Sequence, residues 1–273
     1  MIHINNYIIK KLLKPRLPNS SKATYGHALL IVGSKGSMGA AVLAAKACIR
    51  SGVGMLTVAT AYTERAILQI DIPEAKVISY NEPITKLEQY KAIGIGSGVG
   101  FNEYTTNLLQ LVLNTLTIPI VIDADALSII HNNKLLLPIH NKFILTPHII
   151  EYDRLYGVHK THSIRIKSAI MQAKLQGVII VLKNYNTVIT DGTTTYINDI
   201  SNTGLAKAGS GDALTGLITG LLAQGFSTLH AAIFGVHIHS IAASITLSTQ
   251  SEESMIISDV IDNIGNAYKL IEK

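Results

Sequence analysis

The segment at residues 202–216 holds the groups best suited to chemistry. Gly209, Ser210 and Gly211 precede a run of small and apolar residues that predicts a helix. Because two of these residues lack a Cβ atom, their N–H groups can approach an anion at the positive end of that helix. Asp212 follows in the first turn, where a carboxylate can accept the proton of an attacking hydroxyl. The alternative is that Asp212 only caps the helix.

Carboxylates and a histidine follow two other apolar runs. Asp123 and Asp125 come directly after residues 119–122, at a strand end where ligands collect in open α/β sheets. Carboxylates at this spacing can hold Mg²⁺ through water or orient a hydroxyl, and the alternative is a helix cap. We expect one functional and one capping residue. His148 lies between Pro147 and a predicted helix, where it is either structural or a ligand contact.

Glycines mark two loops where a ligand can approach the backbone. The first loop has glycines at positions 33, 36 and 39, which do not match the Gly-x-Gly-x-x-Gly dinucleotide fingerprint, so a tight turn is the alternative. The second has alternate glycines from Gly94 to Gly100 at the end of a buried run. Alternate glycines indicate close approach of a ligand, although a simple loop is also compatible with them.

The composition indicates a globular protein with a large core. The chain has 273 residues, 48% hydrophobic and 15% charged, so one α/β domain can bury enough surface to fold. The net charge of +5 comes from scattered Lys and Arg residues, which argues against nucleic acid and for mild attraction of phosphorylated ligands. The single cysteine, Cys48, excludes an internal disulfide and suits a cytoplasmic location.

Residues 229–247 are long and apolar enough to span a membrane. His230, His237, His239 and Ser240 argue against a span, and we expect a buried helix and no membrane association. His237 and His239 are two positions apart and point in different directions on a helix, so we expect no metal between them.

Apolar runs of strand length alternate with helical patterns along the chain. Strands are expected at 28–32, 55–59, 75–79, 92–95, 119–122, 143–145 and 178–182, and helices at 38–51, 64–70, 103–113, 128–131, 162–176, 229–247 and 258–271. Asp191-Gly192 predicts a hairpin between 188–190 and 194–197. Residues 1–22 form an N-terminal arm. The alternation predicts one three-layer α/β/α domain over residues 1–273, with a mostly parallel central sheet.

The motif at 202–216 resembles the Gly-x-Gly-Asp signature of ribokinase-like enzymes. In its wider form, Asn-x-Gly-x-Ala-x-x-Gly-Ser-Gly-Asp-x-Leu-x-Gly, it is similar to that of the ADP- or ATP-dependent NAD(P)H-hydrate dehydratases. The segment 22–34 and the following Gly39-Ala40-Ala41 resemble the opening of that family. The resemblance covers Lys22 to about His239 in six ordered motifs and implies the ribokinase-like fold.

The resemblance also implies a role for each matching residue. Asp212 is the expected catalytic base and also contacts the substrate. The other expected substrate contacts are Gly39, Ala40, Gly98, Gly100, Asp125 and His148. The expected nucleotide and phosphate contacts are Lys183, Asn184, Tyr185, Asn186, Thr187, Ala208, Gly209, Ser210 and Gly211, and Glu151 is a candidate Mg²⁺ residue acting through water.

Three positions depart from the family pattern. Ser97 stands where Gly-Pro-Gly-x-Gly has its proline, Ile149-Ile150 replaces Pro-Gly between His148 and Glu151, and Asn184 replaces the glycine of Leu-Lys-Gly-x-x-Thr. Without the resemblance, Lys183 indicates only a solvated strand end.

The function implied by the resemblance is nucleotide-dependent dehydration of the (S)-epimer of hydrated NADH or NADPH. The intermediate is phosphorylated, and the products are phosphate with AMP from ADP, or with ADP from ATP. Mg²⁺ is an expected cofactor. Many bacterial members carry a fused epimerase domain that we expect to be absent here, so a separate epimerase is the expected functional partner. A homotetramer is expected by analogy.

Two other functions are compatible with parts of the sequence. One is a vitamin kinase of the same fold, acting on a hydroxymethylpyrimidine, a thiazole or pyridoxal, but His148 and the 96–100 loop favour the dehydratase. The other is a nucleotide-sensing protein without turnover, which the intact Asp212 disfavours.

Overall fold

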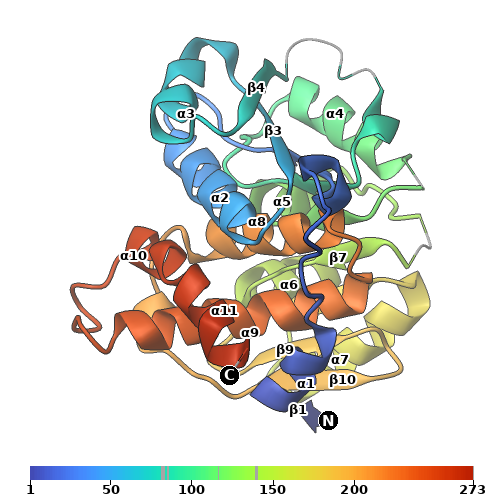
Figure 1. Ribbon diagram of the computed structural model, residues 1–273. Helices are drawn as coiled ribbons and strands as arrows, with labels where there is room; N and C mark the ends of the chain where they lie inside the picture. The colour runs from blue at the N-terminus through green and yellow to red at the C-terminus, as the bar shows by residue number, and fades with distance from the viewer. Residues whose placement is uncertain (81–83, 85, 116, 139–140, 273) are drawn as a thin grey trace.

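A ten-stranded sheet runs through the centre of the protein in this computed structural model, which describes residues 1–80, 84, 86–115, 117–138 and 141–272 (Figure 1). The strand order is β1(Ile2–His3), β10(Thr195–Asn198), β9(Thr187–Thr190), β8(Ile179–Leu182), β7(Phe143–Leu145), β6(Ile120–Ile122), β5(Ala92–Ile95), β2(His27–Ile31), β3(Met55–Thr60) and β4(Lys76–Ser79). The β8–β9 and β9–β10 pairs are antiparallel, and the other pairs between these ten strands are parallel. The mostly parallel α/β/α fold predicted from the sequence is confirmed.

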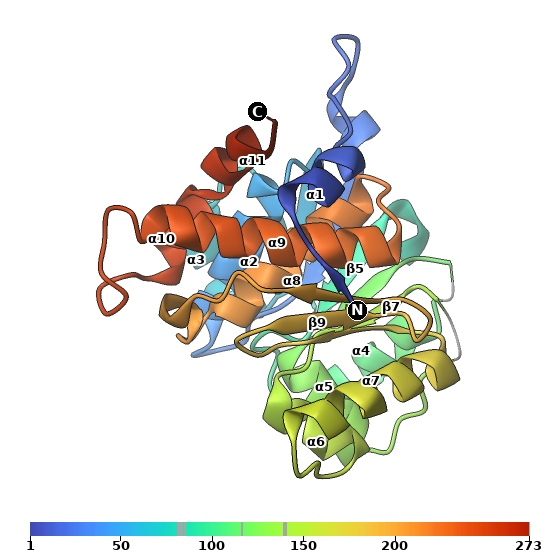
Figure 2. The ribbon, with the colours of Figure 1, turned by 90° about the horizontal axis from the view of Figure 1, so that it is seen from below.

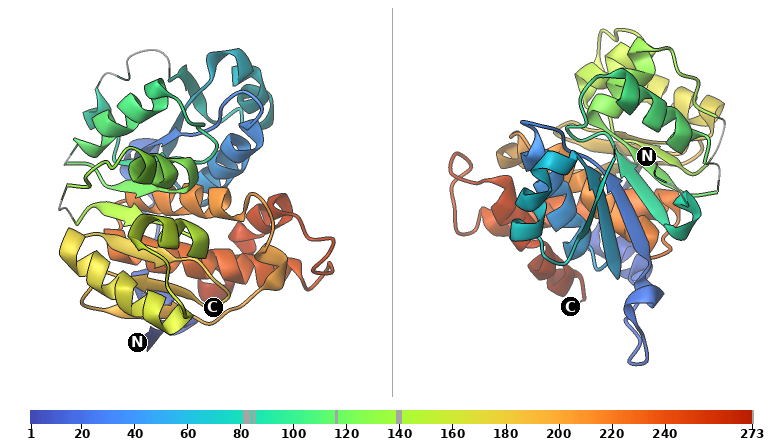
Figure 3. Two further views of the ribbon diagram at one scale, coloured as in Figure 1. Left: turned by 180° about the vertical axis from the view of Figure 1, so that it is seen from behind. Right: turned by 90° about the horizontal axis from the view of Figure 1, so that it is seen from above.

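Alternate side chains of the strands enter two separate cores. In β2, Ala28 and Leu30 face one core and Leu29 and Ile31 face the other, as expected for a strand covered on both sides. The first core is covered by α2(Met38–Arg50), α8(Ser210–Ala223), α9(Thr228–Thr246), α10(Ile257–Asp262) and α11(Ile264–Glu272), with α3(Arg65–Asp71) against α2. The second is covered by α4(Glu103–Leu113), α5(Ala124–Asn132), α6(Ile149–Tyr156) and α7(His162–Gln176). Figures 2 and 3 show these green and yellow helices on the side of the sheet opposite α9.

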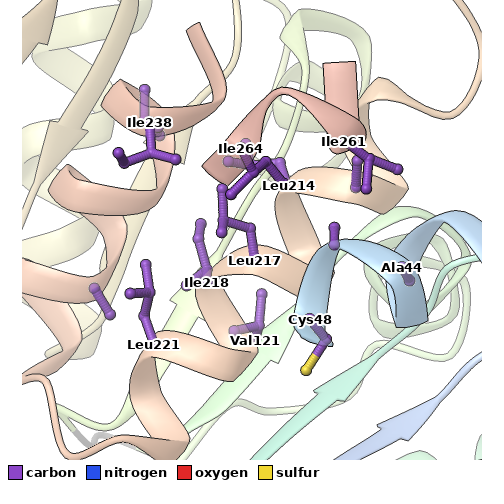
Figure 4. Packing of buried hydrophobic residues seen from close by; sticks show 14 of the residues in the cluster. Ala44, Cys48, Val121, Leu214, Leu217, Ile218, Leu221, Ile238, Ile261 and Ile264 are labelled. Carbon is purple, nitrogen blue, oxygen red and sulfur yellow. The ribbon is translucent and has the colours of Figure 1, made fainter. Parts of the chain in front are cut away.

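The helix that follows the glycine motif, α8, packs tightly against α2 (Figure 4). A Cβ atom on Gly216 would lie 1.8 Å from the carbonyl oxygen of Ala44, and one on Gly220 would lie 2.0 Å from Ser51 Oγ. Leu217 and Leu221 on the same helix are buried in the first core. The small residues of α8 are therefore required by close contact with α2.

The apolar helix α9 lies inside the protein. Its length and composition suit a membrane span, but 72% of the relevant window is buried in the fold. His237 on this helix bonds to Asn198 and Asn6, each at 2.9 Å. The expectation of a buried helix is confirmed.

Both ends of the chain differ from the predicted elements. The N-terminal arm adds β1 to the sheet beside β10, and its helix α1(Asn6–Leu12) packs on α9 and α11. The single closing helix predicted at 258–271 is wrong, because the chain forms α10 and α11 with a break at Asn263. The expected Ser or Asp cap is also wrong, since the N-cap of α10 is Ile256. The hairpin at Asp191-Gly192 is confirmed, with Gly192 at a φ of 84°.

Candidate active site

A cavity of about 680 Å³ opens beside the N-terminus of α8. Its wall is formed by the start of α6, the end of β8, the segment between β10 and α8, and one face of α9. The lining includes Asp123, His148, Glu151, Lys183, Asn184, Tyr185, Thr187, Asn198, Ile200, Leu205, Lys207, Gly209, Ser210, Gly211, Asp212, Val236, His239 and Ser240. The lining therefore combines polar groups with the apolar side chains of Ile200, Leu205 and Val236.

The N-terminus of α8 presents unpaired N–H groups. Gly209 is the N-cap, with a φ of 95° that a glycine adopts without strain. Ser210 N–H bonds weakly to Lys207 at 3.4 Å, whereas those of Gly211 and Asp212 have no acceptor in the described part of the chain. Together with the helix dipole, these groups suit an anion. Asp212 is the third residue of α8 and does not cap it.

The Asp212 carboxyl has a raised pKa because it is buried. The Ser97 hydroxyl and the Lys183 ammonium act in the opposite direction, while the neighbouring Asp123 and Asp125 carboxylates add to the rise. A carboxylate with a raised pKa is a stronger proton acceptor once it is ionised. Asp212 is therefore suited to take a proton from a bound hydroxyl.

Asp123 is a buried carboxylate with both oxygens occupied. Lys183 Nζ donates to Oδ1 at 2.8 Å, and Thr215 Oγ1 donates to Oδ2 at 2.9 Å. Asp123 occupies the N-cap position of α5 without a capping side-chain bond, and Asp125 accepts from Gly100 instead. The expectation that one of the two carboxylates caps this helix is wrong. The pairing of Asp123 with Lys183 was not predicted, since the two residues are far apart in the chain.

The two glycine loops lie side by side. A Cβ atom on Gly98 would be 3.1 Å from the Cβ atoms of both Ala40 and Ser37. Gly100 N–H donates to Asp125 Oδ2 at 2.9 Å. Burial raises the pKa of Asp125, and this hydrogen bond offsets part of the rise. The expected substrate contacts Gly39, Ala40, Gly98, Gly100 and Asp125 thus form a group outside the cavity lining.

His148 begins α6 through a capping box. Its Nδ1 accepts from the N–H groups of Ile150 at 3.1 Å and Glu151 at 3.2 Å, and Glu151 Oε2 accepts from His148 N–H at 2.8 Å. With Nδ1 as an acceptor, the proton of the neutral ring is on Nε2. Ile149 and Ile150 therefore do not disturb the start of this helix.

Glu151 places a carboxylate at this corner beside His148 and Lys183. It lies 4.0 Å from Lys183 Nζ through Oε2, and its other oxygen lies 3.5 Å from His148 Nε2. Within the described ranges, no group of three or more His, Cys, Asp or Glu side chains has the arrangement of a metal site. A cation here would need oxygen ligands from water and bound phosphates, which is the usual way that proteins hold Mg²⁺.

The expected nucleotide contacts divide between cavity and surroundings. Lys183, Asn184, Tyr185, Thr187 and the residues 209–211 line the cavity, and Asn186 and Ala208 are not among its lining residues. Asn198, His239 and Ser240 line it without having been predicted, because nothing in the sequence pairs β10 with α9. Asn198 Nδ2 donates to Ser240 Oγ at 2.9 Å.

Comparison with known proteins points to one family. The family model described as NAD(P)H-hydrate dehydratase matches residues 28–266. The bifunctional NAD(P)H-hydrate repair enzyme of Moorella thermoacetica is 31% identical in a match that covers 96% of this chain and 52% of that protein. The ADP-dependent (S)-NAD(P)H-hydrate dehydratase of Enterococcus faecalis is 31% identical over 246 residues, which cover 88% of this chain and 84% of that protein. The chain spans about half the length of the bifunctional relatives that it matches.

A solved structure extends this likeness to three dimensions. The ADP/ATP-dependent NAD(P)H-hydrate dehydratase from Bacillus subtilis, co-crystallized with ATP and Mg²⁺, matches with a TM-score of 0.90 at 31% identity. The match covers 98% of both chains.

Proposed function

The chain belongs to the NAD(P)H-hydrate dehydratase family, which its motifs resemble, and on that premise we propose that it restores NADH and NADPH from their hydrated forms. The substrate is the (S)-epimer, in which water has added to the nicotinamide ring, and ADP or ATP is the phosphoryl donor. The ring hydroxyl becomes a phosphate ester, and phosphate then leaves. Hydroxide is a poor leaving group and phosphate a good one, so phosphorylation makes the dehydration possible.

The observation that carries this proposal is the environment of Asp212. Its buried carboxyl has a raised pKa, lines the cavity and lies in the first turn of α8, at an open helix N-terminus. A hydroxyl bound against the loops would lose its proton to Asp212 as it attacks the terminal phosphoryl group. The oxygen of the attacking ring hydroxyl, the phosphorus of the terminal phosphoryl group and the leaving oxygen of the nucleotide then lie roughly in line.

The groups around the helix N-terminus are proposed to stabilise the transferred phosphoryl group. The free N–H groups of Gly211 and Asp212 and the helix dipole act on its developing negative charge. Lys183 Nζ lies 3.1 Å from where a Cβ of Gly211 would be, so its ammonium is close to the same point. Of the other expected nucleotide contacts, Asn184, Tyr185 and Thr187 also line the cavity.

Mg²⁺ is part of the proposal as a partner of the nucleotide. Glu151 is proposed to serve the ion through water, with its Oε2 accepting from His148 N–H at 2.8 Å. When bound, the ion neutralises charge on the phosphates. An epimerase that supplies the (S)-epimer, a homotetrameric assembly and a cytoplasmic location also remain proposals, supported by the names of the bifunctional relatives, by family analogy and by the single buried cysteine respectively.

The test follows recovery of dihydronicotinamide absorbance from hydrated NADH and NADPH, with ADP and ATP supplied separately and Mg²⁺ present. Wild-type protein should restore absorbance and release phosphate. Asp212→Asn should lose about 10³-fold or more in turnover, as expected for removal of a general base, while its nucleotide affinity stays within about threefold of wild type. Asp191→Asn, in the hairpin turn, is the matched control and should keep full activity.

Other outcomes would contradict the proposal. Full activity of Asp212→Asn would remove the base from this mechanism. Phosphorylation of a hydroxymethylpyrimidine, a thiazole alcohol or pyridoxal in preference to the hydrates would indicate a vitamin kinase. Nucleotide binding without phosphate release on any of these substrates would indicate a sensing protein.

A further inference from the structure

His239 is a buried histidine on α9 to which the proposed reaction gives no role. It is 5% exposed and lines the cavity beside the N-terminus of α8. Its Nε2 atom has no hydrogen-bond partner in the described part of the chain. Buried polar atoms are nearly always bonded, so one without a partner calls for an explanation. A residue in a cavity wall can find the missing partner in a ligand.

His239 belongs to a group of polar side chains in the cavity wall. Val236, His239 and Ser240 are spaced by three and four positions, so they share one face of α9, and all three line the cavity. Ser240 Oγ accepts from Asn198 Nδ2 at 2.9 Å, which ties this face of the helix to β10. Asn198 also lines the cavity. Asn198, His239 and Ser240 therefore form one buried polar cluster, the His239 cluster.

The β10 member of the cluster lies beside the segment expected to hold the nucleotide. Asn198 is 2% exposed, and its Oδ1 lies 2.9 Å from His237 Nδ1, so its amide is held in place. In the antiparallel β9–β10 pair, Asn198 is directly opposite Thr187. Residues opposite each other have side chains on the same face of the sheet. Since Thr187 is an expected nucleotide contact in the cavity lining, the His239 cluster adjoins the expected nucleotide site.

The His239 cluster is uncharged at neutral pH. Burial lowers the pKa of His239 to about 4, and the charge of Lys183 acts in the same direction. A neutral imidazole has one N–H donor and one acceptor nitrogen. Phosphate groups are instead bound by cationic side chains and by N–H groups at helix N-termini, which Lys183 and α8 supply. The cluster therefore suits an uncharged part of the nucleotide.

The same lining also suits a flat aromatic group. It includes the apolar side chains of Ile200, Leu205 and Val236. Ligand sites of about 300–1,000 Å³ combine such walls with a few polar groups that fix the orientation of the ligand, and this cavity has about 680 Å³. Among the parts of a nucleotide, the base is flat, apolar on its faces and polar along its edge. The base is therefore the part that fits these side chains best.

We propose that His239, supported by Asn198 and Ser240, hydrogen-bonds the edge of the base of the phosphoryl-donor nucleotide and gives the site its preference for adenine. The proposal rests on the proposed function, in which ADP or ATP is the donor. His239 is then a specificity-determining residue whose ring gains a partner in the base. It takes no part in the proton transfer to Asp212.

The test measures dissociation constants of ADP, GDP, UDP and inorganic pyrophosphate by calorimetric titration in the presence of Mg²⁺. His239→Phe keeps an aromatic ring and removes both ring nitrogens. His230→Phe is the matched control, because it makes the same change at an exposed position of the same helix, outside the cavity lining. Wild-type protein should bind ADP more tightly than GDP or UDP.

His239→Phe should weaken ADP binding about tenfold, the size expected for the loss of one hydrogen bond to a ligand. The ring does not contact the phosphates, so the affinity for pyrophosphate should stay within about twofold of wild type, as should the affinities for GDP and UDP. His230→Phe should follow wild type with every ligand. If His239→Phe kept the wild-type preference for ADP, or lost as much affinity for pyrophosphate, the proposal would be wrong.

The nucleotides 2′-deoxy-ADP and 3′-deoxy-ADP separate a contact with the base from a contact with the ribose. If His239 bonds to the base, His239→Phe loses the same factor on both of these nucleotides as on ADP. If the loss disappeared with either of them, the ring would bond to a ribose hydroxyl, and the assignment to the base would be overturned.

A second measurement uses wild-type protein and does not depend on catalysis. Nitrogen-15 NMR of labelled histidines, with the His239 signals identified by their absence in His239→Gln, should show a shift of a His239 ring nitrogen when ADP is added. Pyrophosphate should leave these signals in place, and an equal response to both ligands would contradict the proposal. If wild-type protein binds ADP but proves inactive on the hydrates, the proposed function fails, while these titrations still decide the role of His239.

Discussion

Two groups of residues in the candidate site are built in different ways. In the cavity lining, Asp123, Lys183, Glu151 and His148 are held by side-chain hydrogen bonds and ion pairs. Outside the lining, residues 33–39 and 96–100 approach each other through their backbones and meet where a glycine lacks a Cβ atom. The first group is suited to binding charged groups, and the second to fitting the shape of a ligand.

Because of this difference, we expect substitutions in the two groups to have different effects. A side-chain network loses stability when one member is removed, because its buried partner is left without compensation. A backbone surface instead loses its shape when an atom is added. The following substitutions test that contrast.

The largest effect is expected from Lys183→Met. It leaves the Asp123 carboxylate, 1% exposed, with Thr215 as its only side-chain donor in the described ranges, and should lower the free energy of unfolding by about 3 kcal/mol. Denaturant unfolding measures this change, and nucleotide affinity should fall as well. Lys46→Met breaks an ion pair with Asp71 whose side chains are 33% and 41% exposed, and should cost less than about 1 kcal/mol.

The double variant Lys183→Met with Asp123→Asn removes both charges and should recover much of the lost stability. If Lys183→Met were no more destabilising than Lys46→Met, the hydrogen bonds and ion pairs among Asp123, Lys183 and Glu151 would not stabilise this part of the site.

An intermediate effect is expected from Gly98→Ala. The φ of 65° disfavours alanine by about 1 kcal/mol, and the new Cβ would lie 3.1 Å from Ala40 and Ser37. We expect a several-fold rise in KM for the hydrate with unchanged nucleotide affinity. Gly36→Ala is the matched control, because its φ of 85° carries the same strain while its Cβ would meet nothing within 4 Å. Equal KM values for the two variants would contradict the proposal that the shape of the glycine loops determines how the hydrate binds.

The smallest effect concerns the stability of Asp212→Asn. Because the pKa of Asp212 is raised in the folded state, the folded state binds this proton more tightly than the unfolded state does. The free energy of unfolding of the wild type therefore falls as the pH rises from the unfolded pKa through the folded pKa. Asparagine does not ionise. The variant should therefore melt a few degrees higher than wild type above the folded pKa, with the difference vanishing below the unfolded value. Calorimetry over a range of pH measures this difference in melting temperature, with Asp191→Asn as the control. A difference between Asp212→Asn and wild type that is the same at every pH would contradict the prediction.

Much of the fold follows from local pattern. The helices predicted at 103–113 and 162–176 coincide with α4 and α7, because their ends carry local signals such as the Asn102 and Thr161 caps and Gly177. The break between α10 and α11 was not predicted, since the apolar spacing continues through Asn263. The strand β1 also escaped prediction, because two residues form a strand only beside their partner β10, far along the chain.

The site shows the same limit. The motif at 209–212 carries its own geometry, with a left-handed Gly209 before a helix, so its placement was predictable. Asp123 and Lys183 are 60 positions apart, and no local rule joins them. Ser97 was noticed in the sequence only as a departure from the family pattern. That its side chain is buried is a result of the fold and could not be predicted from the local sequence.

The contact of α8 with α2 constrains how the enzyme can move. Where Gly216 and Gly220 lie, the backbone of α2 and its C-cap Ser51 leave no room for even a methyl group, so sliding of α8 along α2 would bring larger side chains into a steric clash. Asp212 is thus carried by a helix that is closely packed in the core. We therefore expect the reactants to be brought to a base that stays where it is.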